Sequence, residues 1–391
     1  MRKKTAAFIL SGSLAFAAAA QAQETIKIGL IMPYSGQFAD TAAQMDNGIK
    51  LYVQRHGATG AGKKIEFIRK DTGGVAPDVA KRLAQELVVR DGVDILAGFV
   101  LTPNALAAAD VSASAKKLMV IMNAGTSIIT TKSPYSVRTS ITLPQAAESL
   151  GMWAAKNGIK KVYTMVSDFG PGHDAEQGFQ RAFKEAGGEI VGSVRFPVAN
   201  PDFSAFVQRA KDLNPESIFL FVPAGAQPAA FAKALAERGL DPKTVKVLGT
   251  GEVTAETALK GMGDASLGII TAWNYAPEHD TGSNAAFVRD YVAAYGRTPD
   301  FMSVGGYDGM HLIYEALKKT GGKTDGDALI DAAKGMKWDS PRGVIAIDPE
   351  TRDVVQNIYI RRVEKVGGEP RNVIIDTIKD VKDPVLGRMK K

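Results

Sequence analysis

Short apolar segments and segments of helical length alternate along this chain of 391 residues, and the alternation limits the fold more than any other feature. In the first half we expect strands at 26–32, 64–69, 93–97 and 118–122. Helices are expected between them, at 40–55, 77–90 and from 102 onward. Proline stands in the first turn of several of these helices, where its missing N–H costs no hydrogen bond. The pattern predicts parallel sheets joined by right-handed crossovers, and therefore the α/β class.

The same alternation continues from 144 to 272, so we expect two sheets and two lobes. Three further helices have no strand between them, at 284–295, 303–319 and 325–334. We expect these helices to return and cover the first sheet. The segments 354–363 and 372–378 flank Gly367 and Gly368, which predicts a β-hairpin. The two halves share this pattern but no residue-level repeat.

The N-terminus has the composition of an export signal. Arg2, Lys3 and Lys4 precede an apolar stretch at 6–20, and Ala-Gln-Ala at 20–22 has the small-residue pattern of a cleavage site. We therefore expect 1–22 to be a cleaved signal peptide and the mature protein to be periplasmic. The chain contains no cysteine, so the exported protein would rely on its core rather than on disulfides.

Charge and histidine usage argue against several classes of partner. The formal charge is +6, and it falls to +3 without 1–22, which hold three cations and no acids. The basic residues are scattered, so we expect no nucleic-acid partner. The four histidines show no metal-ligand spacing and no cysteine can assist them, so we expect neither a metal nor a cofactor. Asp71 and Asp308 end predicted elements, where we expect them to act as caps.

The loop after the predicted strand 93–97 is a candidate binding site. Gly98 ends the strand, Thr102 is predicted to cap the next helix, and Pro103 to occupy its first position. A helix start at the end of a strand presents free N–H groups, which favour an anion such as a carboxylate. A second loop, 123–126, leaves the next strand. Two such loops predict an anion-binding site that requires no catalyst.

Two patterns imitate enzyme motifs but fail in their context. Gly57, Gly62 and Lys63 resemble a phosphate-binding loop, but Lys64 stands where Ser or Thr must bind magnesium, and a helix precedes the loop. Ser114, with a lysine three residues later, imitates a motif of penicillin-binding enzymes but lies near the end of its predicted helix. The sequence therefore predicts no catalytic residue and no enzyme.

Several segments in a fixed order resemble the type I periplasmic binding proteins, in the leucine/isoleucine/valine-binding branch that serves ATP-binding-cassette (ABC) importers. The matching segments are 28–36, 47–49, 98–104, 123–126, 168–172 and 305–309. The resemblance implies two lobes, each a parallel sheet flanked by helices, and a hinge of three chain crossings near 140–143, 272–276 and 345–348. It implies that 23–141 plus 276–346 form lobe 1, and that 142–275 plus 347–391 form lobe 2.

The resemblance also implies a function. Such a receptor captures a small carboxylate by lobe closure and delivers it to an ABC transporter permease in the inner membrane. We expect a monomer, because a monomer suits lobe closure. Two alternatives remain open: a ligand-sensing subunit of a signalling receptor, which would share the pocket, and a secreted enzyme.

The resemblance implies ligand contacts from both lobes. In lobe 1 the residues expected to hold the ligand carboxylate are Leu101, Thr102, Asn123, Ala124, Gly125 and Thr126. In lobe 2 the residues expected to close over the ligand are Phe169, Pro171, Ala226, Gln227 and Glu252. Gln227 is equally a candidate helix cap. Phe38 and Tyr275 could stack on an apolar part of the ligand, or pack at a lobe surface or the hinge.

One departure from the family's pattern bears on the ligand. Amino-acid binders of this branch use an acidic residue after the strand that matches 245–248, and Gly251 stands at that position here, with Glu252 one place later. Either Glu252 pairs with the ligand ammonium, or the site has no ammonium partner. Because a buried unpaired ammonium is unfavourable, the second case disfavours amino acids. We therefore expect the ligand to be a branched-chain or other hydrophobic amino acid, or an aromatic acid.

Overall fold

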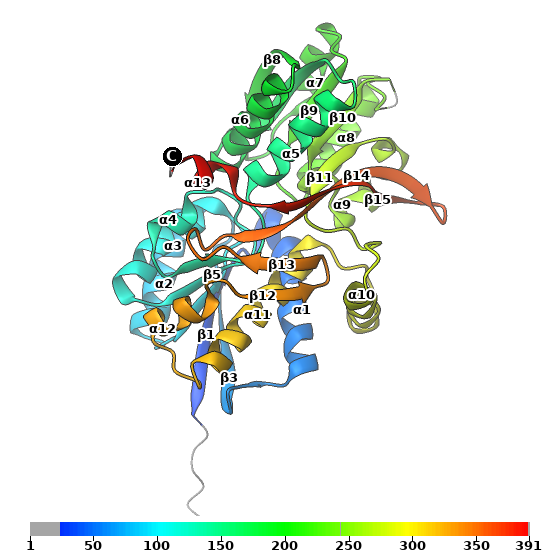
Figure 1. Ribbon diagram of the computed structural model, residues 1–391. Helices are drawn as coiled ribbons and strands as arrows, with labels where there is room; N and C mark the ends of the chain where they lie inside the picture. Colours follow the sequence, from blue (N-terminus) through cyan, green and yellow to red (C-terminus); the bar gives the residue numbers. More distant parts are fainter. Residues whose placement is uncertain (1–23, 243, 390–391) are drawn as a thin grey trace, which may run out of the picture.

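The computed structural model describes residues 24–242 and 244–389, which form two lobes (Figure 1). The predicted signal peptide, 1–22, lies outside the described residues. Each lobe contains a sheet with helices on its faces, so the predicted α/β class and two-lobe fold are confirmed. Within the described ranges, every helix is too short or too polar to cross a membrane.

The first lobe is built on a six-stranded sheet with the order β2-β3-β1-β4-β5-β6. Its strands are β1 (Thr25–Met32), β2 (Thr59–Gly60), β3 (Lys63–Asp71), β4 (Ile95–Gly98), β5 (Leu118–Ile121) and β6 (Ser136–Arg138). All neighbours pair in parallel except β2 and β3. β1 is central, and its Ile28 and Leu30 are fully buried because helices cover both faces of the sheet.

The helices of the first lobe come from two parts of the chain. They are α1 (Ala39–His56), α2 (Pro77–Val89), α3 (Thr102–Ala115), α4 (Ile129–Lys132), α10 (Gly282–Tyr295), α11 (Phe301–Lys319) and α12 (Gly326–Ala333). α10 and α11 pack against α1, so the expectation that the later helices return to the first sheet is confirmed.

The second lobe contains a nine-stranded sheet with the order β12-β13-β14-β11-β10-β9-β7-β8, in which β15 also pairs with β14. Its parallel strands are β7 (Lys161–Ser167), β8 (Glu189–Phe196), β9 (Ser217–Phe221), β10 (Lys246–Thr250) and β11 (Ile270–Trp273). Its helices are α5 (Leu143–Lys156), α6 (Gly170–Glu185), α7 (Phe203–Asp212), α8 (Gln227–Glu237), α9 (Glu256–Met262) and α13 (Pro384–Met389).

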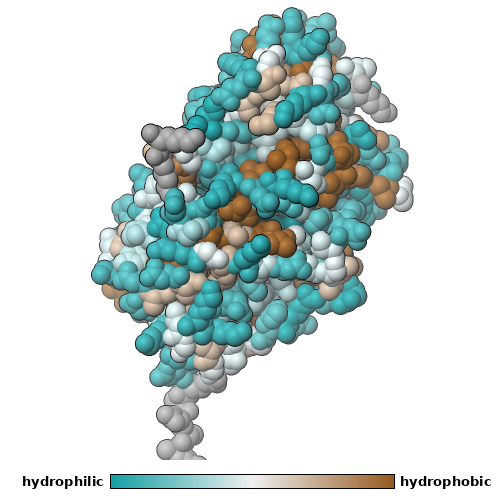
Figure 2. Space-filling view, in the orientation of Figure 1, coloured by the Kyte–Doolittle hydropathy of each residue, from teal (hydrophilic) through white to brown (hydrophobic). Residues whose placement is uncertain are grey.

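Antiparallel strands join the two lobes. β14 (Val354–Val366) and β15 (Glu369–Val381) form the predicted hairpin. The start of β14 pairs with β13 (Gly343–Ile347), which forms an unpredicted hairpin with β12 (Lys337–Ser340). The remainder of β14 pairs with β11, so this one strand runs from one lobe into the other (Figure 1). Figure 2 shows hydrophobic residues concentrated on this face along the same band, where β13, β14 and β15 run.

Candidate ligand-binding site

The two lobes enclose a cavity that contains about 410 Å³ of empty space, including its open mouth. The residues that line it are Phe38, Thr41, Val100, Leu101, Thr102, Asn123, Gly125, Leu143, Phe169, Pro171, Phe221, Pro223, Ala224, Glu252 and Met302. Most of them follow the carboxyl ends of parallel strands, namely β1, β4, β5, β7, β9 and β10. Open α/β sheets bind ligands at this edge.

The structure brings eight of the predicted site residues together in this lining. They are Phe38, Leu101, Thr102, Asn123, Gly125, Phe169, Pro171 and Glu252. The other five predicted residues, Ala124, Thr126, Ala226, Gln227 and Tyr275, lie outside the lining. Ala124 is buried in the core that packs between the first sheet and its helices. The Tyr275 hydroxyl donates a hydrogen bond to Oδ1 of Asn284 at 3.0 Å, so this ring belongs to the protein interior.

Gln227 does not have the helix-cap role that the sequence suggested, and it lies outside the cavity lining. Ala226 occupies the N-cap position of α8 and is exposed, so the predicted Gln227 cap is wrong. Gln227 is the first residue of the helix, and its Nε2 atom donates to the carbonyl of Val198 at 2.6 Å. Its side chain therefore holds a neighbouring loop of the second lobe.

Sequence reasoning missed six other, mostly apolar, residues of the lining. Thr41, Val100, Leu143, Phe221, Pro223 and Met302 all face the cavity without having been predicted. Phe221 and Pro223 lie at the end of β9 and just after it, and that position was the only available signal. Apolar side chains carry no such signal by themselves, because their sequence pattern is that of the core.

The start of α3 presents unpaired polar groups to the cavity. Leu101 is the N-cap of α3 and makes no side-chain cap, so the prediction that Thr102 caps the helix is wrong. Thr102 is the first helical residue, and its buried Oγ1 atom has no hydrogen-bond partner among the described residues. The first amides of a helix also lack intrahelical acceptors. The hydroxyl and these amides together favour an anion.

Backbone contacts hold the two loops of the first lobe side by side. Phe99 adopts a left-handed φ of 64°, which is strained for a residue with a side chain. The amide of Ala124 donates to the Phe99 carbonyl at 2.9 Å, and Nδ2 of Asn123 donates to the Val100 carbonyl at 2.8 Å. The strained loop after β4 is therefore fixed by the loop after β5.

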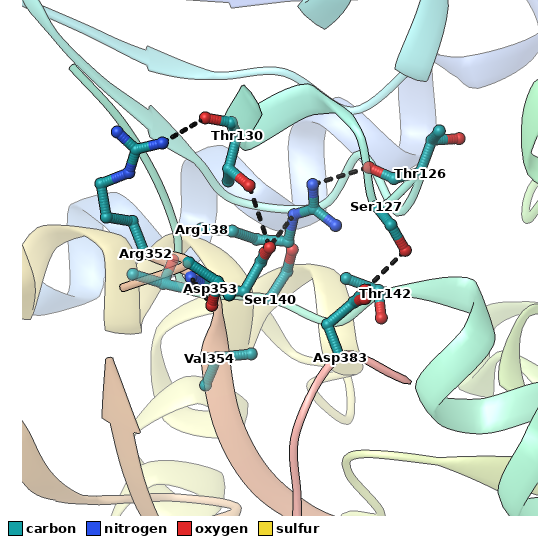
Figure 3. A network of polar contacts seen from close by, with 12 residues as sticks. Thr126, Ser127, Thr130, Arg138, Ser140, Thr142, Arg352, Asp353, Val354 and Asp383 are labelled. Carbon is teal, nitrogen blue, oxygen red and sulfur yellow. Dashed lines mark hydrogen bonds and ion pairs between the residues drawn. The ribbon is translucent and has the colours of Figure 1, made fainter. Parts of the chain in front are cut away.

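A buried polar network holds the loop after β5 in place (Figure 3). Arg138 Nη2 donates to the Thr126 carbonyl at 2.7 Å, and Arg138 Nε lies 3.2 Å from Asp353 Oδ1. Ser127 Oγ donates to Asp383 Oδ2 at 2.5 Å. Burial raises the pKa of Asp353 to about 6, and the Arg138 guanidinium opposes that rise. The network connects the loop to segments at both ends of the β14–β15 hairpin.

Glu252 is the one ionisable residue in the lining. It is buried in the turn after β10, and its Oε2 atom has no hydrogen-bond partner among the described residues. Burial raises the pKa of Glu252 to about 7, against smaller opposing effects of the Thr250 hydroxyl and the Arg361 guanidinium. Arg361 also donates from Nη1 to the Tyr275 carbonyl at 2.6 Å. Near neutral pH the Glu252 carboxyl can therefore accept a hydrogen bond from a ligand when it is ionised, or donate one when it is protonated.

The lobes touch each other around the cavity. A Cβ atom added to Gly225 of the second lobe would lie 3.0 Å from the carbonyl oxygen of Gln37 in the first lobe. A Cβ atom added to Gly170, at the start of α6, would lie 3.7 Å from Thr126 Oγ1. The structure is thus the closed arrangement, and small residues permit it. Among the described residues, no group of acidic, histidine or cysteine side chains is arranged to hold a metal ion.

This fold, with a cavity that both lobes line, defines a receptor that closes around a small ligand. The sequence pattern of the family described as "Periplasmic binding protein" matches residues 25–369. The chain therefore belongs to the periplasmic binding protein family, as its sequence predicted.

Relatives in this family define the class of function. "Leu/Ile/Val-binding protein homolog 6" of Brucella melitensis is 42% identical over 384 residues, which are 97% of each chain. A solute-binding protein of an ABC transporter from Rhodopseudomonas palustris BisB5, solved in complex with 3,4-dihydroxybenzoic acid, is 56% identical with a TM-score of 0.90. That match covers 93% of this chain and 99% of the other.

A second solved structure supports the same class. An R. palustris solute-binding protein in complex with 4-hydroxybenzoate is 42% identical with a TM-score of 0.90, over 93% of this chain and all of the other. The two solved relatives are thus solute-binding proteins of ABC transporters, which confirms the predicted class of function.

Proposed function

We propose that this protein is the periplasmic receptor for an aromatic monocarboxylate of the hydroxybenzoate kind. The single observation that carries the proposal is the distribution of polar groups in the cavity. The Thr102 hydroxyl and the start of α3 lie on one lobe, and the carboxyl of Glu252 lies on the other. The remaining lining is largely apolar and includes the rings of Phe38, Phe169 and Phe221.

Each part of a hydroxybenzoate has a partner in this arrangement. The ligand carboxylate would accept hydrogen bonds from Thr102 and the first amides of α3. The ligand ring would lie among the three phenylalanines, of which Phe169 and Phe221 have ring centroids 6.0 Å apart. A ring hydroxyl would donate to Oε2 of Glu252, which lacks a partner among the described residues. The ligands of the two R. palustris proteins support this assignment.

A branched-chain or other hydrophobic amino acid is the second candidate. The name of the Brucella homologue favours it, and Glu252 would then pair with the ligand ammonium. The apolar lining accepts either kind of ligand, so Glu252 decides between them. The two proposals differ in whether the group that meets Glu252 is a hydroxyl or a cation.

The remaining parts of the proposal concern the whole protein. We propose that 1–22 are a cleaved signal peptide, that 23–141 plus 276–346 form lobe 1, and that 142–275 plus 347–391 form lobe 2. The receptor works as a monomer and passes its ligand unchanged to the permease. Chromatographic recovery of the intact ligand would exclude a secreted enzyme. Crosslinking to a permease, rather than to a signalling receptor, would exclude a sensory subunit.

A thermal-shift screen of the mature protein tests the ligand class. One set contains benzoate, 4-hydroxybenzoate and 3,4-dihydroxybenzoate, and the other contains leucine, isoleucine, valine and phenylalanine. A ligand at about a thousand times its dissociation constant should stabilise the protein by about 4 kcal/mol, a shift of several degrees. We expect shifts with the aromatic set. Shifts with the amino acids alone would replace the first candidate with the second.

The variant Glu252→Gln tests whether the Glu252 carboxyl contacts the ligand. It should reduce the preference for hydroxylated over plain benzoate, because an amide is a weaker acceptor for a hydroxyl than a carboxylate. Glu256→Gln is the matched control. Burial raises the pKa of Glu256 to about 7 as well, but its carboxyl accepts from Asn372 and does not line the cavity. A preference that changes equally in both variants would remove Glu252 from the site.

A further inference from the structure

The three segments that connect the lobes meet at one buried cluster of polar groups. The first segment follows β6 and contains Ser140, the second follows β11 and contains Asn274, and the third is the start of β14 and contains Gln356. Arg342 reaches the cluster from the turn between β12 and β13. All four residues are buried. We call them the hinge cluster.

The carbonyl oxygen of Ser140 is the common acceptor of the hinge cluster. Arg342 Nη1 donates to it at 2.7 Å, Gln356 Nε2 at 2.9 Å and Asn274 Nδ2 at 3.2 Å. The donors belong to the second crossing, the third crossing and the β12–β13 turn, while the acceptor belongs to the first crossing. A single atom therefore connects all three segments.

The orientation of the Gln356 amide is fully determined by its neighbours. Its Oε1 atom accepts from Arg342 Nη1 at 2.6 Å and from Asn274 Nδ2 at 3.2 Å. Its Nε2 atom donates to the Ser140 carbonyl and to Gln145 Oε1 at 3.1 Å. The amide faces donors with its oxygen and acceptors with its nitrogen. No other residue type of this size and polarity satisfies both sides.

Each lobe holds one side of the hinge cluster. On the first lobe, Arg342 Nε donates to Oδ2 of Asp308 in α11 at 2.9 Å, and both side chains are buried. On the second lobe, Gln145 of α5 donates from Nε2 to the carbonyls of Val354 at 2.9 Å and Val381 at 2.8 Å. Gln356 lies between these two anchors. When one lobe rotates against the other, the contacts of the Gln356 amide must either change or serve as the pivot of the rotation.

A second contact limits where the rotation can occur. Arg138 and Asp353 form a buried ion pair between the first and third segments, beside Ser140 (Figure 3). Arg138 N also donates to the Arg352 carbonyl at 3.0 Å. Both segments are therefore fastened to the first lobe up to 138 and 353, so the third segment leaves that lobe a few residues after the boundary proposed at 346/347. The motion is left to the next few residues of these two segments, which include Ser140 and Gln356 of the hinge cluster.

We propose that Gln356 and Asn274 are positioning residues that set the equilibrium between open and closed lobes. Neither lines the cavity, so neither selects among ligands. These contacts are made in the arrangement in which both lobes line the cavity, and we infer that their loss favours an open arrangement. Since apparent affinity is scaled by the fraction of binding-competent protein, such a change weakens every ligand by the same factor.

Binding measurements on Gln356→Met test the proposal. Methionine keeps the length of the side chain and removes its polar contacts. We expect the dissociation constants of 4-hydroxybenzoate and benzoate to rise together, by about tenfold, with their ratio unchanged. Gln180→Met is the control, because the Gln180 amide donates to Thr164 within the second lobe. A changed ratio, or equal effects in both variants, would overturn the proposal.

A distance measurement tests the same proposal without a ligand. The chain has no cysteine, so spin labels can be placed cleanly at Lys233→Cys on α8 and Lys318→Cys on α11, which are both exposed and lie on different lobes. In the ligand-free protein we expect Gln356→Met to shift the distance distribution away from the closed arrangement. Asn274→Ala should do the same to a smaller extent, and it serves as the second variant if Gln356→Met does not fold.

The experiments can refute the ligand assignment and the proposed role of the hinge cluster independently of each other. If the wild-type protein binds neither benzoate nor 4-hydroxybenzoate, the ligand assignment is wrong. The distances between the spin labels still decide the role of the hinge cluster. Distances and affinities that stay unchanged in a folded Gln356→Met would limit Gln356 to a structural role.

Discussion

Benzoate should bind more weakly as the pH rises from about 6 to about 8, and Glu252 is the reason. Burial raises the pKa of this carboxyl to about 7, and it lines the cavity that would hold the benzoate anion. Benzoate has no group that can donate to an ionised Glu252. Its binding above the pKa therefore requires the carboxyl to take up a proton, because two unpaired buried anions repel each other.

The size of the effect follows from linkage. A ligand that binds only the protonated form loses up to tenfold in affinity, or about 1.4 kcal/mol, for each pH unit above the pKa. With the pKa of Glu252 at about 7, benzoate should lose about tenfold between the two pH values. The ring hydroxyl of 4-hydroxybenzoate donates to the ionised carboxyl, in a charge-assisted hydrogen bond of about 1.5–3 kcal/mol. Its affinity should change little.

Isothermal titration calorimetry of both ligands at the two pH values, at constant ionic strength, measures this difference. The preference for 4-hydroxybenzoate over benzoate should grow about tenfold with pH in the wild-type protein. It should be independent of pH in Glu252→Gln. A benzoate affinity that is flat with pH in the wild type, or a slope that persists in Glu252→Gln, would refute the reasoning.

Three other predictions follow from the same geometry. The folded-state pKa of Glu252 lies above its ordinary value of 4.5, so its contribution to stability falls as the pH rises from about 5 to 7. Urea unfolding should therefore find ligand-free Glu252→Gln more stable than wild type at about pH 8, by up to about 3 kcal/mol, with a much smaller difference at about pH 4.5. Thr102→Ala should weaken any carboxylate by about 1–3 kcal/mol in calorimetry, and unchanged affinity would exclude the anion site. Gly225→Ala should weaken all ligands alike, because its φ of 119° is strained for alanine and its Cβ would meet Gln37, whereas a loss confined to one ligand would contradict this closure contact.

Local signals in the sequence were sufficient for the strands and for part of the site. The segment 118–122 predicts the buried strand β5 (Leu118–Ile121), because a short apolar run between turn residues is typical of a strand buried on both faces. Thr102 and Asn123 follow the ends of neighbouring parallel strands, so their common location could be predicted. The hydroxyl of Thr102 is available to a ligand because Leu101 occupies the cap position, and that detail depends on backbone geometry.

Contacts between distant residues account for what the sequence could not reveal. β12 (Lys337–Ser340) alternates polar and apolar residues only briefly, and it forms a strand because it pairs with β13, which in turn pairs with β14. The sequence pattern predicts Asp308 as a cap at the end of an element. The structure instead places it inside α11, bonded to Arg342, so that prediction is wrong. The hinge cluster depends on such a pairing and has no local signature.

Titration of the mature protein with 4-hydroxybenzoate and with leucine, in the same calorimeter and buffer, tests the central claim most directly. We expect saturable binding of 4-hydroxybenzoate at one site per chain and no heat of binding from leucine. Stoichiometric binding of leucine without binding of 4-hydroxybenzoate would contradict the claim, and would make Glu252 the partner of an ammonium group.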